Sequence, residues 1–197
     1  VAELAEACRK YDMKLGLYYS QELDFHEQHG GGVHYVDPWL GCDWANNWDF
    51  PNKEEKDFSI CLEKKIKPQL KELLTKYGDL LLIWCDDPCE ITAQQSQEVY
   101  DLIKQYQPDC LVPSRVGNGI GDFHSFGDNQ LPDKDWGGLG ESCVTMNHTW
   151  GYKGYDNDWK TVDEILEIKE RVNACGVNLL LNVGPDHLGR IPAPSVE

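Results

Sequence analysis

One buried segment constrains the fold of this chain more than any other feature. The stretch GDLLLIWCDDP, residues 78–88, runs four large apolar residues into Trp84 and then into two aspartates, Asp86 and Asp87. A continuous apolar run of this length, closed by Pro88, fits a strand that is covered on both faces, as in parallel α/β sheets. Ligands in that architecture gather at the carboxyl ends of the strands. A carboxylate placed there either caps the following segment or takes part in chemistry.

Helices and strands are predicted to alternate along the chain. Apolar residues at helical spacing predict four helices, over residues 3–11, 56–78, 92–108 and 161–176. Shorter apolar runs predict strands over residues 13–20, within 78–88, and over 109–115, 141–146 and 177–185. Pro68 predicts a kink or two consecutive helices within the second helical segment. Residues 21–56 have no clear period and are interpreted as a long loop, functional or partly disordered. The predicted class is α/β with parallel strands.

Two α/β architectures compete. A doubly wound sheet is expected to carry a phosphate-binding glycine fingerprint, and GNGIGD at 117–122 has a similar spacing. This stretch follows Arg115 in a loop and opens no helix, so the match is rejected. Polar or aromatic groups end several of the predicted strands: Tyr19–Ser20, Trp84–Asp86, Ser114–Arg115 and Asn182. Functional residues contributed by many strand ends are typical of a (β/α)-barrel, which is the favoured architecture.

The charge balance and the positions of cysteine and histidine indicate which partners and metal ions to expect. Acidic residues outnumber basic ones 34 to 18, which gives a formal net charge of −16. The chain has no lysine- or arginine-rich run, so nucleic acid and anionic membrane are not expected as partners, and a neutral substrate fits better. Cys85 and Cys89 have no partnering cluster, so zinc is not predicted. His26, His29 and His34 lack a fixed ligand spacing and are interpreted as solvated loop residues.

Four stretches in order carry a family resemblance: GLYYS, LLLIWCDD, CVTMNHTWGY and NLLLNVGPDHLGRIP. They resemble motifs of glycoside hydrolase family 29, the α-L-fucosidases, and the resemblance covers almost the whole chain. It implies a (β/α)8 barrel followed by a β-sandwich. Residues 1–197 would hold about the third strand onward, with the earlier barrel strands and the β-sandwich outside this chain.

The same resemblance implies a retaining exo-α-L-fucosidase that acts on a fucosylated oligosaccharide or glycoconjugate and needs no cofactor. It also implies a secreted, periplasmic or lysosomal protein. The chain contains no segment that is predicted to cross a membrane. Two alternatives stay open: a catalytically inactive sugar-binding relative, and a barrel glycosidase with another sugar specificity.

The resemblance assigns Asp86 as the nucleophile. Trp84-Cys85-Asp86 matches the family's Trp-x-Asp triplet at the end of a central strand, from which an ionised carboxylate attacks the anomeric carbon. Asp87 stands where the family pattern has a glycine. We expect Asp87 to turn outward and cap the next segment; in the alternative, both carboxylates point inward.

The acid/base is assigned to a loop carboxylate. GDFHSFGDNQLP resembles the family segment that carries this group, and aligning on Leu131-Pro132 puts Asp128 at its position. Glu141 is the runner-up, at the glutamate of the family's Trp-Glu pair, although Gly140 replaces the tryptophan. The other candidate carboxylates of this region are Asp122, Asp133 and Asp135.

The resemblance also assigns sugar contacts to Arg115, Trp84 and one of Tyr18 and Tyr19. Alternation along a strand allows only one of the two tyrosines to face the site, and the sequence leaves open which one. A rim ion pair is the alternative for Arg115. Trp150 is either a pocket aromatic or, as slightly favoured, a core residue. The glycosylation sequon at 147–149 is expected to be buried and unmodified.

Overall fold

The computed structural model describes residues 1–30 and 46–196, which form two compact units, Val1–Asp122 and Phe123–Glu197. His34 lies outside the described residues. Each unit contains a parallel sheet with helices beside it. The predicted α/β class with parallel strands is therefore confirmed for both units.

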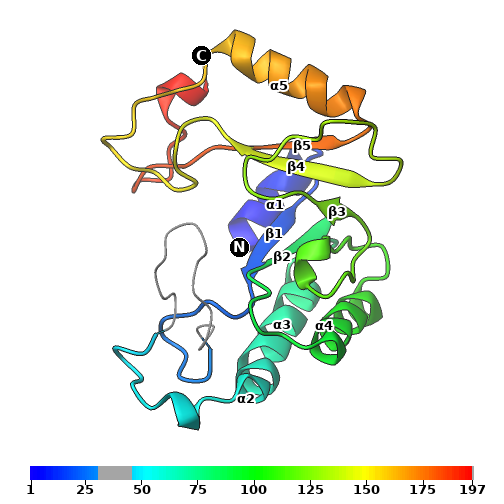
Figure 1. Ribbon diagram of the computed structural model, residues 1–197, viewed down its shortest axis with the longest axis vertical. Coiled ribbons are helices and arrows are strands. Elements are labelled where there is room, and N and C mark those ends of the chain that lie inside the picture. Colours follow the sequence, from blue (N-terminus) through cyan, green and yellow to red (C-terminus); the bar gives the residue numbers. More distant parts are fainter. Residues whose placement is uncertain (31–45, 197) are drawn as a thin grey trace. The chain divides into compact units, whose positions relative to one another are not determined.

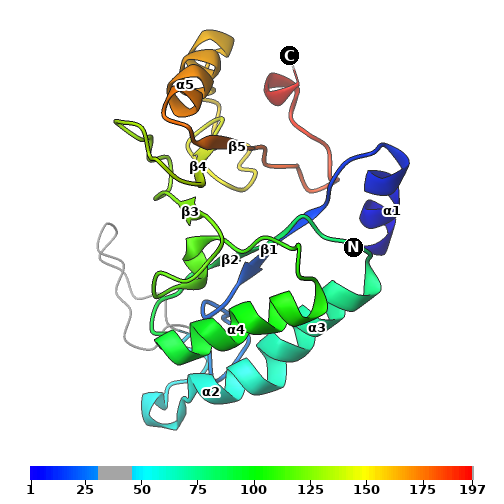
Figure 2. The same cartoon turned by 90° about the vertical axis from the view of Figure 1, so that its right-hand side faces the viewer.

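The first unit is built on two parallel strands, β1 (Gly16–Ser20) and β2 (Leu82–Asp86), which pair in register from Gly16 with Leu82 to Ser20 with Asp86. Helices α3 (Lys67–Lys76) and α4 (Ala93–Tyr106) lie side by side against this sheet (Figures 1 and 2). Helix α1 (Ala2–Lys10) precedes β1. Ile83 and Cys85 of β2 are fully buried and pack with apolar side chains of the two covering helices. Trp84, on the opposite face of the strand, is also buried, at 9% exposed, and burial on both faces makes β2 read as a continuous apolar run.

The predicted helix over 56–78 is composed of consecutive segments. A 3₁₀ turn (Lys53–Glu55) precedes α2 (Phe58–Cys61), a π-helical turn (Leu62–Ile66) follows α2, and α3 follows directly. Asp57 caps α2 by accepting a hydrogen bond from the Ser59 amide at 2.9 Å. Pro68 sits in the first turn of α3, where a missing N–H is tolerated. The arrangement matches the predicted alternative of consecutive helices.

The predicted strand over 109–115 is wrong. It contains isolated bridge residues, Leu111 and Pro113, of which Leu111 pairs with Leu82, and Ser114–Val116 is a 3₁₀ turn. Val112 has its backbone amide and carbonyl bonded to Asp122, which removes both groups from a strand ladder. Pro113 has no amide to donate. By contrast α4 begins as predicted at Thr92, whose hydroxyl accepts from the Gln95 amide in a capping box.

The second unit has three parallel strands in the order β3 (His124–Ser125), β4 (Gly140–Thr145) and β5 (Asn178–Asn182). Helix α5 (Val162–Ala174) runs along β5 (Figure 1) and starts with a capping box at Thr161. A small core of Phe126, Val172, Cys175 and Val177 lies beneath it. A 3₁₀ turn (Ala193–Ser195) lies near the carboxyl end. No helix in residues 1–30 and 46–196 is long and apolar enough to cross a bilayer.

Candidate functional site

Asp86 is the last residue of β2, and two side chains hold its carboxylate. The Tyr18 hydroxyl donates to Oδ2 at 3.0 Å, and Arg115 Nη1 donates to Oδ1 at 3.0 Å. The side chains of Arg115 and Asp86 are only 17% and 18% exposed, so solvent screens their attraction less than at a free surface. Burial, followed by the charges of Asp86 and Asp87, raises the pKa of Tyr18, so its hydroxyl remains a donor.

An aromatic wall lies beside the carboxylate. Trp84 and Asp86 are two residues apart on β2 and so project from the same face, while Cys85 turns into the core. The Tyr18 ring stacks on the Trp84 ring with centroids 5.7 Å apart. The Arg115 guanidinium lies over the same indole, 4.8 Å from its centroid, as a cation–π contact. A carboxylate, a guanidinium and aromatic faces together offer the polar and apolar contacts that a sugar ring uses.

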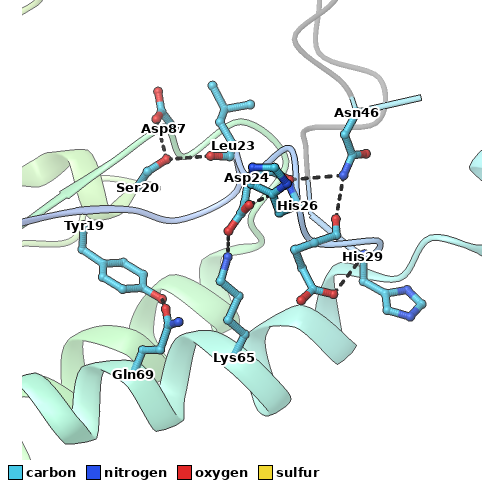
Figure 3. Close-up of polar contacts among 11 residues, drawn as sticks. Tyr19, Ser20, Leu23, Asp24, His26, His29, Asn46, Lys65, Gln69 and Asp87 are labelled. Carbon is cyan, nitrogen blue, oxygen red and sulfur yellow. Dashed lines mark hydrogen bonds and ion pairs between the residues drawn. The ribbon is translucent and has the colours of Figure 1, made fainter. Parts of the chain in front are cut away.

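The two tyrosines of β1 have different partners. Tyr18 faces Asp86, whereas the Tyr19 hydroxyl donates to Gln69 Oε1 of α3 at 2.7 Å (Figure 3). Tyr19 also packs against the core between the sheet and the helices. Of the two predicted candidates for a sugar contact, Tyr18 is the one placed at the candidate nucleophile, and Tyr19 belongs to the packing layer.

Asp87 does not cap the following segment, so that expectation is wrong. Its Oδ2 accepts a hydrogen bond from Ser20 Oγ at 2.8 Å (Figure 3) and lies 3.4 Å from the Tyr18 hydroxyl. Thr92 supplies the cap of α4 instead. Burial and the charge of Asp86 raise the pKa of Asp87, while Ser20, Tyr18 and Arg115 act in the opposite direction.

Two buried polar residues directly after β1 were missed from the sequence. The Gln21 amide nitrogen Nε2 donates to the carbonyls of Asp86 and Arg115, at 3.2 Å each. Glu22 is 1% exposed, and its carboxylate accepts the amides of Glu90 and Ile91 at 2.8 and 2.6 Å. Burial raises the pKa of Glu22 to about 7. The sequence feature that could have identified these two residues is their position directly after a predicted strand, at its carboxyl end.

The loop histidines that the structure describes have protein partners or face solvent. His29 Nδ1 accepts the Asp57 amide at 3.2 Å, and His26 is exposed with its own amide bonded to Asp24 (Figure 3). Across the described parts of the chain, no group of three His, Cys, Asp or Glu side chains is arranged to hold a metal ion.

Asp128 lies in the second unit, on an exposed turn three residues beyond β3. The next residue fixes this turn to the end of β4. The Asn129 amide donates to the Cys143 carbonyl at 3.0 Å, and Asn129 Oδ1 accepts the Thr145 amide at 2.9 Å. Asp128 is thereby placed at the carboxyl edge of its own sheet, where parallel sheets present functional groups.

Glu141 occupies the opposite end of β4. It is the second residue of the strand, pairs with Ser125 and Asn178, and is 5% exposed. In parallel α/β folds the amino ends of strands are associated with stability and the carboxyl ends with chemistry. The position of Glu141 therefore favours Asp128 as the acid/base candidate.

Trp150 is not a core residue of its unit. It is 38% exposed in the segment after β4, and its carbonyl accepts from Asn182 Nδ2 at 2.8 Å, at the end of β5. The sequon residue Asn147 is 9% exposed, and its Nδ2 lies 3.4 Å from the Asp156 carbonyl. Its predicted burial agrees with the structure, and the absence of modification stays a prediction.

Comparisons with known proteins agree on one family. The family model described as Alpha-L-fucosidase matches residues 1–197. The solved alpha-L-fucosidase AlfC from Lactobacillus casei, in complex with alpha-L-fucose product, is 46% identical with a TM-score of 0.89 over 98% of this chain and 60% of that one. Alpha-L-fucosidase isoenzyme 1 from Paenibacillus thiaminolyticus is 31% identical, with a TM-score of 0.82 over 99% of this chain and 49% of that one.

A curated relative from Caenorhabditis elegans, a putative alpha-L-fucosidase, is 29% identical over 98% of this chain. This chain spans only 38% of that relative's length. The match of the family model over the full chain means that the chain belongs to the alpha-L-fucosidase family.

Proposed function

We propose that the protein is a retaining exo-α-L-fucosidase, which releases terminal α-L-fucose from fucosylated oligosaccharides or glycoconjugates by double displacement. The observation that carries this proposal is the Asp86 carboxylate at the end of β2, bound by Arg115 and Tyr18 beside the Trp84 ring. The solved relative described in complex with alpha-L-fucose product supports fucose as the sugar.

In the first step, Asp86 attacks the anomeric carbon of the fucosyl group. The new bond joins a carboxylate oxygen of Asp86 to that carbon, and the bond from the carbon to the leaving oxygen breaks. Asp128 gives its proton to the leaving oxygen, so the aglycone departs as a neutral alcohol. Arg115 and Tyr18 hold the carboxylate in one orientation, which reduces the entropy cost of reaching the line of attack.

In the second step, Asp128 takes a proton from water, and the resulting nucleophile cleaves the ester between Asp86 and the sugar. Asp86 returns to the carboxylate form and α-L-fucose leaves with its original anomeric configuration. Arg115 stabilises the carboxylate as its charge returns. Besides the substrate and one water molecule, the two proposed steps use only protein side chains.

We also infer that these residues are part of a (β/α)8 barrel, holding about the third strand onward. Parallel strands alternating with helices support this architecture, as does the similarity to solved alpha-L-fucosidases over nearly the whole chain. The proposed groups Asp86 and Asp128 each lie at the carboxyl edge of their own sheet, which is where barrel enzymes place their chemistry.

The test is hydrolysis of an aryl α-L-fucoside by the complete polypeptide, comparing wild type with Asp86→Ala and Asp128→Ala, each with and without azide. We expect Asp86→Ala to lose activity and azide to restore turnover, with a fucosyl azide of inverted configuration as product. Azide should rescue Asp128→Ala with retained configuration, because the covalent intermediate still forms and azide needs no general base.

Asp79→Ala is the matched control, because Asp79 is an exposed carboxylate that precedes β2. It should keep wild-type activity. An inactive wild type that still binds fucose in a calorimetric titration would contradict the hydrolase and indicate a sugar-binding protein. Retained configuration in the azide product of Asp86→Ala would contradict its role as nucleophile.

A further inference from the structure

Asp87 places a second carboxylate against the same hydroxyl that holds Asp86. The Tyr18 hydroxyl is 3.0 Å from Asp86 Oδ2 and 3.4 Å from Asp87 Oδ2. A phenol has one hydrogen, so Tyr18 donates to one carboxylate at a time, and the shorter distance favours Asp86. Ser20 donates to Asp87 Oδ2 at 2.8 Å and holds it from the neighbouring strand (Figure 3). The two carboxylates therefore share one hydrogen-bond network across β1 and β2.

The backbone at Asp87 is that of a position suited to glycine. Its φ is +56°, in the left-handed region that costs most side chains free energy and that aspartate tolerates better than most. The chain nevertheless keeps a side chain here, and that side chain turns back onto β1. A glycine would satisfy the backbone alone, so the carboxylate itself needs an explanation.

We propose that Asp87 is a positioning residue for Asp86, which anchors Ser20 on the paired strand and sets a second negative charge next to the nucleophile. This inference rests on the proposed fucosidase function. Asp87 needs no contact with the sugar for this role. It acts through Ser20, which pairs with Asp86 in the register of β1 with β2, and through the field that two adjacent carboxylates create.

The charge has a defined effect on the first chemical step. Asp86 begins as an anion and ends as a neutral ester, while the sugar develops positive charge at the transition state. The repulsion between Asp86 and Asp87 is present in the ground state and relieved as the bond forms. The charge of Asp87 also attracts the developing cation. Both effects lower the barrier, since they favour the transition state over the ground state.

The ionisation of the pair sets the expected pH dependence. The charged or titratable groups that interact with this pair are Arg115, Tyr18, Glu22 and Cys89. Burial and the charge of Asp86 raise the pKa of Asp87, so Asp87 ionises at a higher pH than an isolated carboxylate would. Removing the charge of Asp87 should move the acidic limb of the rate profile to lower pH.

The experiment measures kcat/KM against pH on the complete polypeptide for wild type, Asp87→Asn and Asp87→Gly. The asparagine keeps the size of the side chain and removes its charge, and the glycine frees the backbone. We expect both variants to lose about 10- to 100-fold in kcat/KM and to move the acidic limb to lower pH. Asp79→Asn is the control and should change neither quantity. Wild-type kcat/KM with an unmoved limb in both variants would overturn the proposal.

A stability measurement tests the anchoring contact without any assay of activity. A double-mutant cycle of Ser20→Ala with Asp87→Gly, which removes the acceptor, followed by urea unfolding, should show coupling of about 3- to 10-fold in the unfolding equilibrium constant. Additive effects would overturn the anchor even if the enzyme is active. An inactive wild type with measured coupling would instead contradict the proposed function and leave the contact established.

Discussion

The two candidate catalytic carboxylates have opposite surroundings within their own units. Asp86 is 18% exposed, has both oxygens bound by side chains and ends a buried strand. Asp128 is exposed on a turn that its neighbour Asn129 ties to β4. The difference suits the two tasks proposed for these carboxylates. A nucleophile must be ionised and aimed, whereas an acid/base must exchange a proton with water and reach leaving groups of different shapes.

The largest effect should separate the two carboxylates of the second unit. We expect Asp128→Asn to lower kcat/KM about 10²- to 10³-fold on a substrate with a poor leaving group and much less on a nitrophenyl fucoside, because only poor leaving groups need the proton. Glu141→Gln, at the amino end of β4, should stay within a few-fold of wild type on both substrates. A leaving-group dependence in Glu141→Gln, with none in Asp128→Asn, would exchange the two roles.

A substitution of Arg115 tests whether its contacts with Asp86 and Trp84 contribute to kcat/KM. Arg115→Lys keeps the positive charge, but a lysine lacks the planar group that lies over Trp84 and donates to Asp86 at the same time. We expect kcat/KM to fall about 10- to 100-fold, measured by initial rates at several substrate concentrations. Arg9→Lys is the matched control, because Arg9 bonds the Tyr77 carbonyl away from the site. Equal activity of Arg115→Lys and wild type would favour the rim ion pair.

The difference between Asp86, at the end of a buried strand, and Asp128, on an exposed turn, also explains which of these positions the sequence pattern predicts. A strand covered on both faces has a compositional signature, a continuous apolar run, which locates β2 and therefore also Asp86, the residue that ends the strand. The turn at Asp128 has no such signature, and only the family resemblance selected it. The predicted strand at 109–115 failed because a distant side chain, Asp122, binds the backbone of Val112. Local pattern carries no information about such a partner.

The same limit accounts for the buried polar residues that were missed. In the sequence, Gln21 and Glu22 look like the start of a loop. Their burial depends on partners at Asp86 and Glu90, which lie more than 60 residues away, so the local sequence does not indicate it. The inward turn of Asp87 was only the less favoured alternative, because nothing in the local sequence indicates its partner Ser20, which lies on another strand. Polar networks that join separate strand ends depend on tertiary structure, and composition alone does not reveal them.

Glu22 provides a prediction on stability that bears on this network. Its pKa is raised from 4.5 to about 7 by burial, so the folded state keeps a proton that the unfolded state releases. The free energy of unfolding should therefore decrease as pH rises from 4.5 to 7, and the decrease is complete above pH 7. Glu22→Gln lacks this titration. The difference in free energy of unfolding between the variant and wild type should therefore shift by about 1 to 3 kcal/mol in favour of the variant as the pH rises from 4.5 to 8.

Urea unfolding of both proteins at several pH values measures that difference, in which the contributions of the other groups cancel. Glu164→Gln is a useful comparison, because Glu164 is a solvent-exposed capping residue with a lowered pKa. Its loss should remove stability above pH 4.5, which is the opposite sign. Parallel curves for wild type and Glu22→Gln would show that Glu22 is ionised in both states.

The smallest effect should distinguish the two faces of β1. Tyr19→Phe removes a hydroxyl whose partner is Gln69 of α3, so we expect a loss of about 1 kcal/mol in the free energy of unfolding and an unchanged kcat/KM. Tyr18→Phe removes a donor to Asp86 and should lower kcat/KM clearly. Because the two residues are adjacent and undergo the same chemical change, only the face of the strand differs between them. Equal kcat/KM in both variants would mean that the hydrogen bond to Asp86 has no role in the reaction.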